Sequence, residues 1–163
     1  MEIRPARMAD IPTLARLNET VQGLHAAAQP TLFKAAPDEA AIGGWFADFL
    51  AKPGAHLLIG EEAGVPVGYI AGLITQYPDN PFRRSFTLGL VDQLTVAAAA
   101  QRRGYGERLL EALLARFRAD GVTRVELSVW AFNEGARGFY ERQGFTTCTC
   151  RMSRDLAPAL HPN

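Results

Sequence analysis

The chain has 163 residues, with 17 basic and 17 acidic side chains and a formal net charge of +0. This balance argues against nucleic-acid binders and polybasic membrane-surface proteins, which depend on a basic excess. No segment approaches the roughly 18 apolar residues of a membrane-spanning helix. The N-terminus also lacks the apolar core of a secretory signal. We therefore expect a soluble, cytoplasmic protein with no nucleic-acid or membrane partner.

The cysteine and histidine residues form no ligand pattern. Cys148 and Cys150 are separated by one residue, which matches neither a CxxC pair nor an easy disulfide. His25, His56 and His161 are scattered along the chain. We therefore expect two reduced thiols and no metal site.

The N-terminal third predicts a strand followed by two helices. Residues 2–6 are short and partly alternating. Asp10 precedes a proline-containing turn that is typical of a helix start, and apolar residues follow at helical spacing. A second apolar stripe predicts a helix over 38–51, ended by Pro53 and Gly54.

The middle of the chain changes to strand-like patterning. Residues 56–62 and 66–76 predict a hairpin, with a turn at 63–64. The segment 77–84 contains too many breakers for regular structure. A third strand is predicted over 85–96, so this part of the chain forms a meander.

Helical spacing returns after this meander. A leucine-rich stripe predicts a long helix ended by Gly121, followed by a strand over 122–130. Asn133 is typical of a helix cap and Gly144 of a helix terminator, and a last strand is predicted over 146–152.

The predicted order is strand, two helices, three strands, helix, strand, helix, strand. This order is typical of a mixed α/β (α+β) fold. We expect a single domain over 1–163 with a frayed tail at 155–163, because no repeat or linker interrupts the pattern.

The most informative segment joins the third meander strand to the long helix. A helix start leaves backbone amides without partners and carries partial positive charge, and Gly104 and Gly106 would let a phosphate approach them. The segment lacks the GK[ST] ending of a P-loop, and Leu109 replaces the third glycine of a dinucleotide fingerprint. From these residues alone, an anion site and a plain helix start with solvated arginines remain equal alternatives.

A family resemblance favours the anion site. Residues 101–106, QRRGYG, match the [QR]xxGx[GA] loop of the GNAT-superfamily N-acyltransferases, which bind acetyl-CoA. Residues 133–145 resemble that family's second signature, NxxAxxFYxxxGF. The resemblance covers nearly the whole chain and is strongest over 92–145. It implies a mostly antiparallel central sheet with helices on both faces.

The resemblance also implies how acetyl-CoA would bind. The amides of residues 101–106 would hold the pyrophosphate, and the strand 94–96 would part from its neighbour to pair with the pantetheine arm. The N–H near Leu94 would stabilise the oxyanion. The implied cofactor-binding residues are Leu94, Thr95, Val96, Gln101, Arg102, Arg103, Gly104, Tyr105, Gly106, Asn133 and Tyr140.

Catalytic roles follow from the same resemblance. Tyr140 matches the general acid that protonates the leaving thiolate, although its helical face also suits the core. Asn133 matches a residue near the thiol end of the cofactor, although a plain helix cap would explain it. Leu90 stands where several family members have a glutamate base. Asp92 is our first candidate for that base and His25 the second; the alternatives are a solvated carboxylate and a packing histidine.

The acceptor site is less specified. By resemblance, the first two helices and the segment 77–84 would wall it, with His25, Phe33, Trp45, Phe46 and Tyr77 as lining residues. Trp45 and Phe46 fit a core stripe equally well.

These inferences combine into one hypothesis. The chain would be an N-acetyltransferase that moves an acetyl group from acetyl-CoA to a primary amine by direct attack in a ternary complex. The acceptor would be a small molecule or a peptide, and a homodimer is allowed. One alternative is an acetyltransferase for protein N-termini or lysines. Another is a non-catalytic acyl-CoA-binding regulatory module. Leu90 supports this alternative because a leucine cannot act as a base.

Overall fold

The computed structural model describes residues 1–154. Backbone packing divides the chain into two compact units, residues 1–128 and 129–163. The single-domain prediction stays a prediction, and the predicted tail at 155–163 lies outside the described residues. Within the described part of the chain, no helix is long and apolar enough to cross a membrane.

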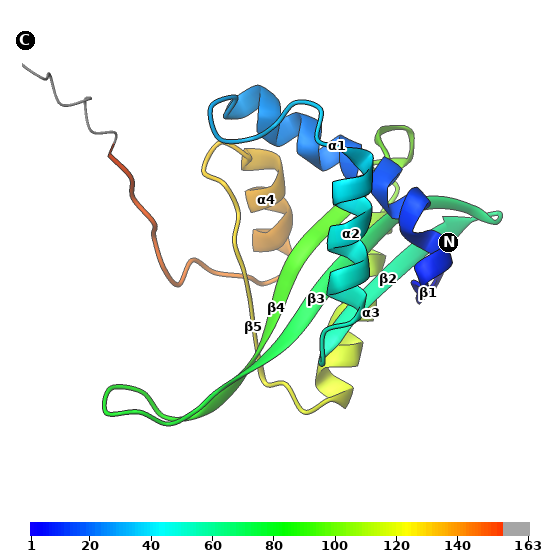
Figure 1. The fold of residues 1–163 in the computed structure, drawn as a ribbon. Coiled ribbons are helices and arrows are strands. Elements are labelled where there is room, and N and C mark those ends of the chain that lie inside the picture. Colours follow the sequence, from blue (N-terminus) through cyan, green and yellow to red (C-terminus); the bar gives the residue numbers. More distant parts are fainter. Residues whose placement is uncertain (155–163) are drawn as a thin grey trace, which may run out of the picture. The chain divides into compact units, whose positions relative to one another are not determined.

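The first unit is built on a five-stranded sheet whose strands are neighbours in sequence order (Figure 1). Only the last pair, β4 and β5, is parallel; the other pairs are antiparallel. This confirms the mixed α/β fold. The strands are β1 (Glu2–Pro5), β2 (Ala55–Glu62), β3 (Val65–Tyr77), β4 (Phe86–Val96) and β5 (Arg124–Leu127).

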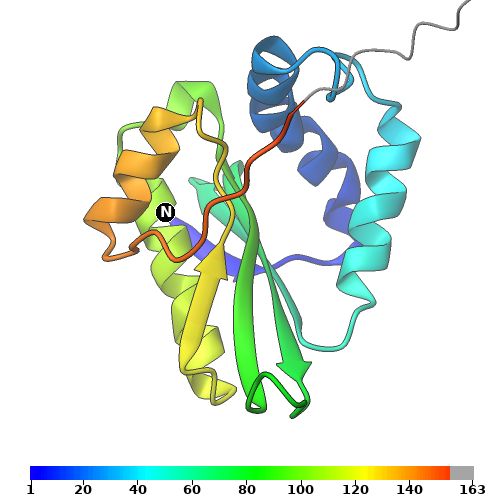
Figure 2. The ribbon, with the colours of Figure 1, turned by 90° about the vertical axis from the view of Figure 1, so that its left-hand side faces the viewer.

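Helices cover both faces of this sheet, as Figure 2 shows. The helices α1 (Ile11–Ala28) and α2 (Glu39–Leu50) lie on one face, and α3 (Tyr105–Ala119) lies on the other. Short 3-10 turns, Met8–Asp10 and Ala98–Ala100, precede α1 and follow β4. The second unit contains α4 (Glu134–Arg142).

Alternation along the strands divides the core between the two faces. Large side chains such as Ile59 and the ring of Tyr69, both 0% exposed, pack with α1 and α2. The α3 face is instead rich in glycine, and a Cβ placed at these glycines would lie within 3.4 Å of an α3 side chain. The glycines are Gly60, Gly68, Gly72 and Gly89. They let α3 approach the sheet closely, which sets where its N-terminus lies.

Three local sequence predictions need correction. No strand forms over 146–152, where the exposed backbone has no ladder partner among the described residues. Thr and Cys alternate there, so neither face offers a large apolar surface to bury. The strand predicted over 122–130 is shorter, since β5 ends at Leu127. Asp10 precedes α1, but its side chain does not cap that helix; it accepts hydrogen bonds from Arg4 and from the Arg7 amide.

The close contact between β3 and β4 makes Gly68 sensitive to substitution. A Cβ there would lie 2.6 Å from the Thr95 carbonyl oxygen, a backbone atom that cannot move aside. We expect Gly68→Ala to lower the free energy of unfolding by about 1–3 kcal/mol, measured by urea titration. The matched control is Gly44→Ala in α2, where a Cβ meets nothing within 4 Å. That change should be neutral or stabilising by up to about 1 kcal/mol; equal losses in both variants would contradict the argument.

Candidate functional site

The outer edge of β4 loses its neighbour halfway along the strand. β5 pairs with β4 from Leu88 opposite Arg124 to Val91 opposite Leu127, and there β5 ends. β4 continues to Val96, held by β3 on its other side. Within the described first unit, the stretch after Val91 therefore has one open edge.

The ladder pattern shows which backbone groups face that edge. The Ala97 amide donates to the Val67 carbonyl at 2.8 Å. In an antiparallel pair, alternate residues direct both their N–H and C=O groups toward the partner strand. Thr95 therefore faces β3, whereas Leu94 and Val96 direct their amides to the open edge. This is the direction required of Leu94 if its N–H is to meet a ligand.

A β-bulge lies where the edge opens. Ala71 pairs with Gln93 and Gly72 pairs with Val91, so Asp92 is an extra residue on β4 without a partner on β3. Bulges re-aim side chains and are frequent beside active sites. Gly72 faces α3, and so does its partner Val91. The charge of Asp92 acts on Tyr69, which packs with α1 and α2, and this places the Asp92 carboxylate toward that side.

The environment of Asp92 favours its protonated form. Its side chain is exposed at the surface, yet the protein atoms around it remove enough water to raise the pKa of the carboxyl above its ordinary value of 3.8. The charge of Lys52 acts in the opposite direction and is the weaker effect. A carboxylate with a raised pKa is a better proton acceptor than an ordinary surface aspartate.

The loop after β4 presents a row of unengaged amides. The Gln101 side chain donates to the Val96 carbonyl at 3.1 Å, which ties the loop to the end of β4. Arg102 and Gly104 have positive φ values of 62° and 76°, which turn the chain into α3. Among described residues, the amides of 102–107 donate no hydrogen bond, and the Arg108 amide makes the first helical bond, to the Gly104 carbonyl. Amides arranged in this way bind anions.

Two more side chains of the predicted cofactor-binding loop anchor it in place. Tyr105 is 7% exposed, packs against Val67 and Ala100, and donates a hydrogen bond from its hydroxyl to Glu62. Arg103 pairs with the same Glu62 carboxylate at 3.0 Å. Their side chains hold the loop on the end of β2, and their backbone amides stay available to a ligand.

The predicted acceptor-site residues do not gather in one place. His25 stacks on Phe33 with ring centroids 4.9 Å apart, and burial lowers the pKa of the His25 imidazole below 6.5. Trp45 packs edge-on to Phe46 and stacks on Phe49, both in the core. Its aromatic contacts therefore favour the core interpretation.

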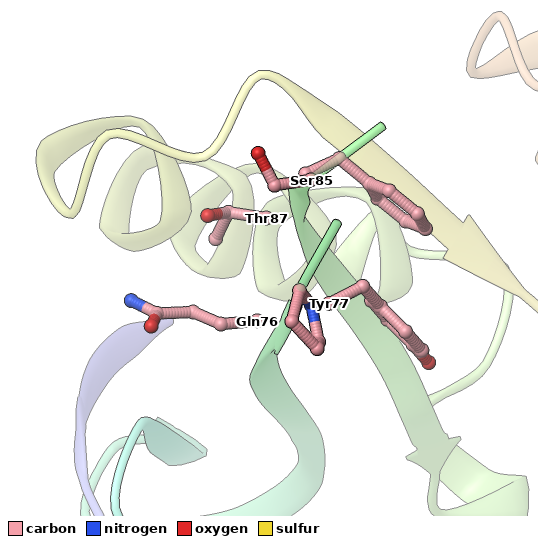
Figure 3. Close-up of a pocket in the computed structure, with 6 residues that line it drawn as sticks. Gln76, Tyr77, Ser85 and Thr87 are labelled. Atoms are coloured by element: carbon pink, nitrogen blue, oxygen red, sulfur yellow. The ribbon is translucent and has the colours of Figure 1, made fainter. Parts of the chain in front are cut away.

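Tyr77 lies at the far end of the sheet, at the tip of the β3–β4 hairpin. There it stacks on Phe86 at 4.6 Å and lines an open pocket of about 560 Å³ (Figure 3). The C-terminal end of α1, which carries His25, is at the opposite end of the sheet (Figure 1). The structure thus separates Tyr77 from His25.

The second unit holds Asn133 and Tyr140. Asn133 caps α4, because its Oδ1 accepts a hydrogen bond from the Ala136 amide at 3.0 Å. Tyr140 packs edge-on against Phe139 and Phe145, and burial raises the pKa of its hydroxyl to about 12. Tyr140 therefore keeps its proton at neutral pH, as a general acid must.

Sequence reasoning missed one group beside the open edge. Gln93, next to Asp92, is engaged by side chains from α1 and β3. The strand pattern around Gln93 carries no signal for this role, because its neighbours come from distant parts of the chain.

The model of the acetyltransferase (GNAT) family matches residues 19–145, more than half of the chain. A mycothiol acetyltransferase from Beutenbergia cavernae is 39% identical over 77 residues, which are 47% of this chain and 24% of that protein. The chain thus matches about a quarter of that relative's length.

Solved structures share the fold. A tetramutant of the BH1408 protein from Bacillus halodurans has a TM-score of 0.90 and 24% identity, covering 96% of this chain and 100% of that one. An aminoglycoside N-acetyltransferase solved in complex with CoA has a TM-score of 0.75 and 14% identity, covering 95% and 93% of the two chains. At these identities the likeness concerns the fold alone.

The raised pKa of Asp92 has a consequence for stability. Because the native state holds this proton more tightly than the unfolded chain, stability falls as the pH rises from 3.8 through the native pKa. We expect Asp92→Asn to stabilise the protein at neutral pH and to lose that advantage below pH 3.8, measured by urea unfolding. A carbon-13 NMR titration should place the Asp92 midpoint above 3.8. Asp48→Asn on the exposed side of α2 is the control; a midpoint at or below 3.8 would contradict the prediction.

Proposed function

The chain belongs to the GNAT acetyltransferase family, and we propose that it transfers an acetyl group from acetyl-CoA to a primary amine by direct attack in a ternary complex. One observation carries the proposal most strongly. The unengaged amides of residues 102–107 lie directly after the open edge of β4. The diphosphate of CoA suits the free amides, and its amide-containing pantetheine arm suits the open strand edge.

The residues present fit this co-substrate. The loop amides would hold the pyrophosphate, helped by the positive end of α3 and by the exposed Arg102. The outward N–H and C=O of Leu94 and the outward N–H of Val96 would pair with the pantetheine amides; the Val96 carbonyl already accepts from Gln101. When bound, acetyl-CoA supplies an activated thioester; the chain's own groups orient it and manage charge and protons.

The Leu94 amide is the proposed oxyanion donor. It is fixed by the β3–β4 ladder and directed to the open edge, so it needs no rearrangement as negative charge develops on the carbonyl oxygen. A donor placed in this way contributes about 3–4 kcal/mol to transition-state stabilisation.

A proton must leave the acceptor before attack, because a free alkyl ammonium has a pKa of about 10. Asp92 is the proposed base, since the bulge turns it to the α1 and α2 side and its pKa is raised. His25 is the second candidate, because its lowered pKa leaves it neutral and able to accept a proton. Tyr140, which keeps its proton, is the proposed acid for the departing thiolate.

The acceptor is proposed to be a small amine. The name of one sequence relative, a mycothiol acetyltransferase, supports small molecules over protein N-termini or lysines. Leu90, at a position where several family members have a glutamate base, favours the second candidate, a non-catalytic acyl-CoA-binding module. Release of free CoA in a screen of small amines would decide against that module. A cytoplasmic location is part of the proposal.

Binding of acetyl-CoA is the first test, by calorimetry. Gly104→Ala places a Cβ on a residue with φ of 76°, so the loop should distort and affinity should fall about tenfold, as expected for a strain of about 1–2 kcal/mol. Gly121→Ala is the matched control, since it has φ of 77° and open space at the other end of α3. It should lose similar stability and keep its affinity. An absence of binding heat in the wild-type protein would overturn the cofactor assignment.

Tyr140→Phe tests the acid. Removing the hydroxyl should lower kcat about 10²-fold or more, because the thiolate leaves without its proton donor, while acetyl-CoA affinity stays nearly unchanged. The measurement is CoA release with an amine found in the screen, together with calorimetry on the same preparation. Unchanged turnover would assign the proton to another donor.

A further inference from the structure

Three polar side chains from separate elements meet inside the first unit. Tyr69 of β3 is fully buried, and Asn18 of α1 is 9% exposed. The Tyr69 hydroxyl donates to Oε1 of Gln93 on β4 at 2.6 Å. The Asn18 amide nitrogen donates to the Tyr69 hydroxyl at 2.9 Å and to the same Oε1 at 3.2 Å. This network packs beside apolar core side chains such as Phe46.

The network fixes the orientation of the Gln93 side-chain amide. Its Oε1 accepts hydrogen bonds from the Asn18 amide and the Tyr69 hydroxyl. If the Gln93 amide were turned over, its NH₂ group would face these two donors and both bonds would be lost. The Nε2 atom of Gln93 donates to no described residue. Every buried side-chain nitrogen and oxygen in the described chain has a hydrogen-bond partner. Nε2 is therefore not buried and is open to solvent. The result is a donor held rigidly by buried partners.

The place of this donor is informative. Gln93 follows the bulged residue Asp92 and precedes Leu94, so it lies between the proposed base and the proposed oxyanion donor. Its contact with Asn18 puts it on the α1 face of the sheet, opposite the helix that begins at the anion-binding loop. The charge of Asp92 adds to burial in raising the pKa of Tyr69, which shows that the carboxylate lies near the network.

We propose that Gln93 determines acceptor specificity: its Nε2 donates a hydrogen bond to an oxygen that the acceptor carries close to its reacting amine. The proposal rests on the proposed function. It names the substrate class as amines with a neighbouring ether, hydroxyl, carbonyl or carboxylate oxygen. A plain alkylamine of the same shape would cover Nε2 without offering a lone pair and would leave a desolvated donor.

Two isosteric probes test this class. 2-Methoxyethylamine and n-butylamine have the same length, and an ether oxygen in the first replaces a methylene in the second. The kcat/KM values, corrected for the fraction of neutral amine, should favour the oxygen-containing probe at least about tenfold in the wild-type protein. The readout is CoA release, and acetyl-CoA affinity is measured on the same samples.

Substitutions at the network separate the donor from the fold. Gln93→Glu keeps a carboxylate oxygen that accepts from Tyr69 and Asn18 but has no donor. The preference, which is the ratio of the kcat/KM values for the two probes, should therefore fall to about one, while the melting temperature stays near wild type. Tyr69→Phe removes the hydroxyl that orients the amide and should reduce the preference in part. Gln76→Glu, at the hairpin end of β3, is the matched control and should keep the full preference.

Each contrary result is decisive. Equal kcat/KM values for the two probes in wild type would overturn the proposal, as would a full preference in Gln93→Glu. Failure to acetylate any oxygen-bearing amine, in protein that binds acetyl-CoA, would overturn it as well. A protein that does not bind acetyl-CoA would instead overturn the proposed function. If Gln93→Glu fails to fold, an unchanged preference in Tyr69→Phe would refute the positioning by the network.

Discussion

The proposed site depends on the unsatisfied hydrogen-bonding groups along the outer edge of β4. Backbone N–H and C=O groups need partners, and a strand that outlasts its neighbour exposes a row of them. β5 ends at Leu127, but β4 continues because β3 pairs with it as far as Val96. Within residues 1–154, the edge is therefore held in extended form without a strand to cover it. Such an edge suits a ligand that has amide groups of its own.

The glycine-rich face of the sheet adds the second half of the site. Gly68, Gly72 and Gly89 leave room for the buried side chains of α3, so that helix lies close to β3 and β4. The connection from β4 to α3 is short and is fastened to Glu62 by Arg103 and Tyr105. The free amides at the helix start consequently lie just beyond the end of β4. Close packing on one face thus places an anion-binding helix start next to an open strand edge.

Sequence reasoning succeeded where the signal is local. The loop 101–106, the Asn133 cap and the positive φ at Gly144 each depend on a few adjacent residues. It failed where the outcome depends on pairing between distant segments. Alternating Thr and Cys suggested a strand over 146–152, although no neighbouring strand pairs with that segment among the described residues.

The bulge is invisible in sequence for the same reason. Asp92 is unpaired because of how β4 matches β3, and nothing between residues 85 and 96 specifies that match. The position of Tyr77 was also beyond prediction from the sequence. The helix- and strand-breaking residues after it indicated a loop, but not the distance of that loop from the centre of the sheet. The lengths of the paired strands β3 and β4 set this distance, and they place Tyr77 far from His25.

The bulge also offers a base to a chain that has a leucine where several family members have a glutamate. In a regular strand, adjacent residues point to opposite faces, so Asp92 and Gln93 could not both face α1. The extra residue at the bulge removes one alternation and turns both side chains to that side. A carboxylate with a raised pKa and an oriented amide donor then lie next to each other, immediately before the outward amide of Leu94. Three consecutive residues of one strand would then accept the proton, recognise the acceptor and bind the oxyanion. The partly exposed Leu90 would have no role in proton transfer.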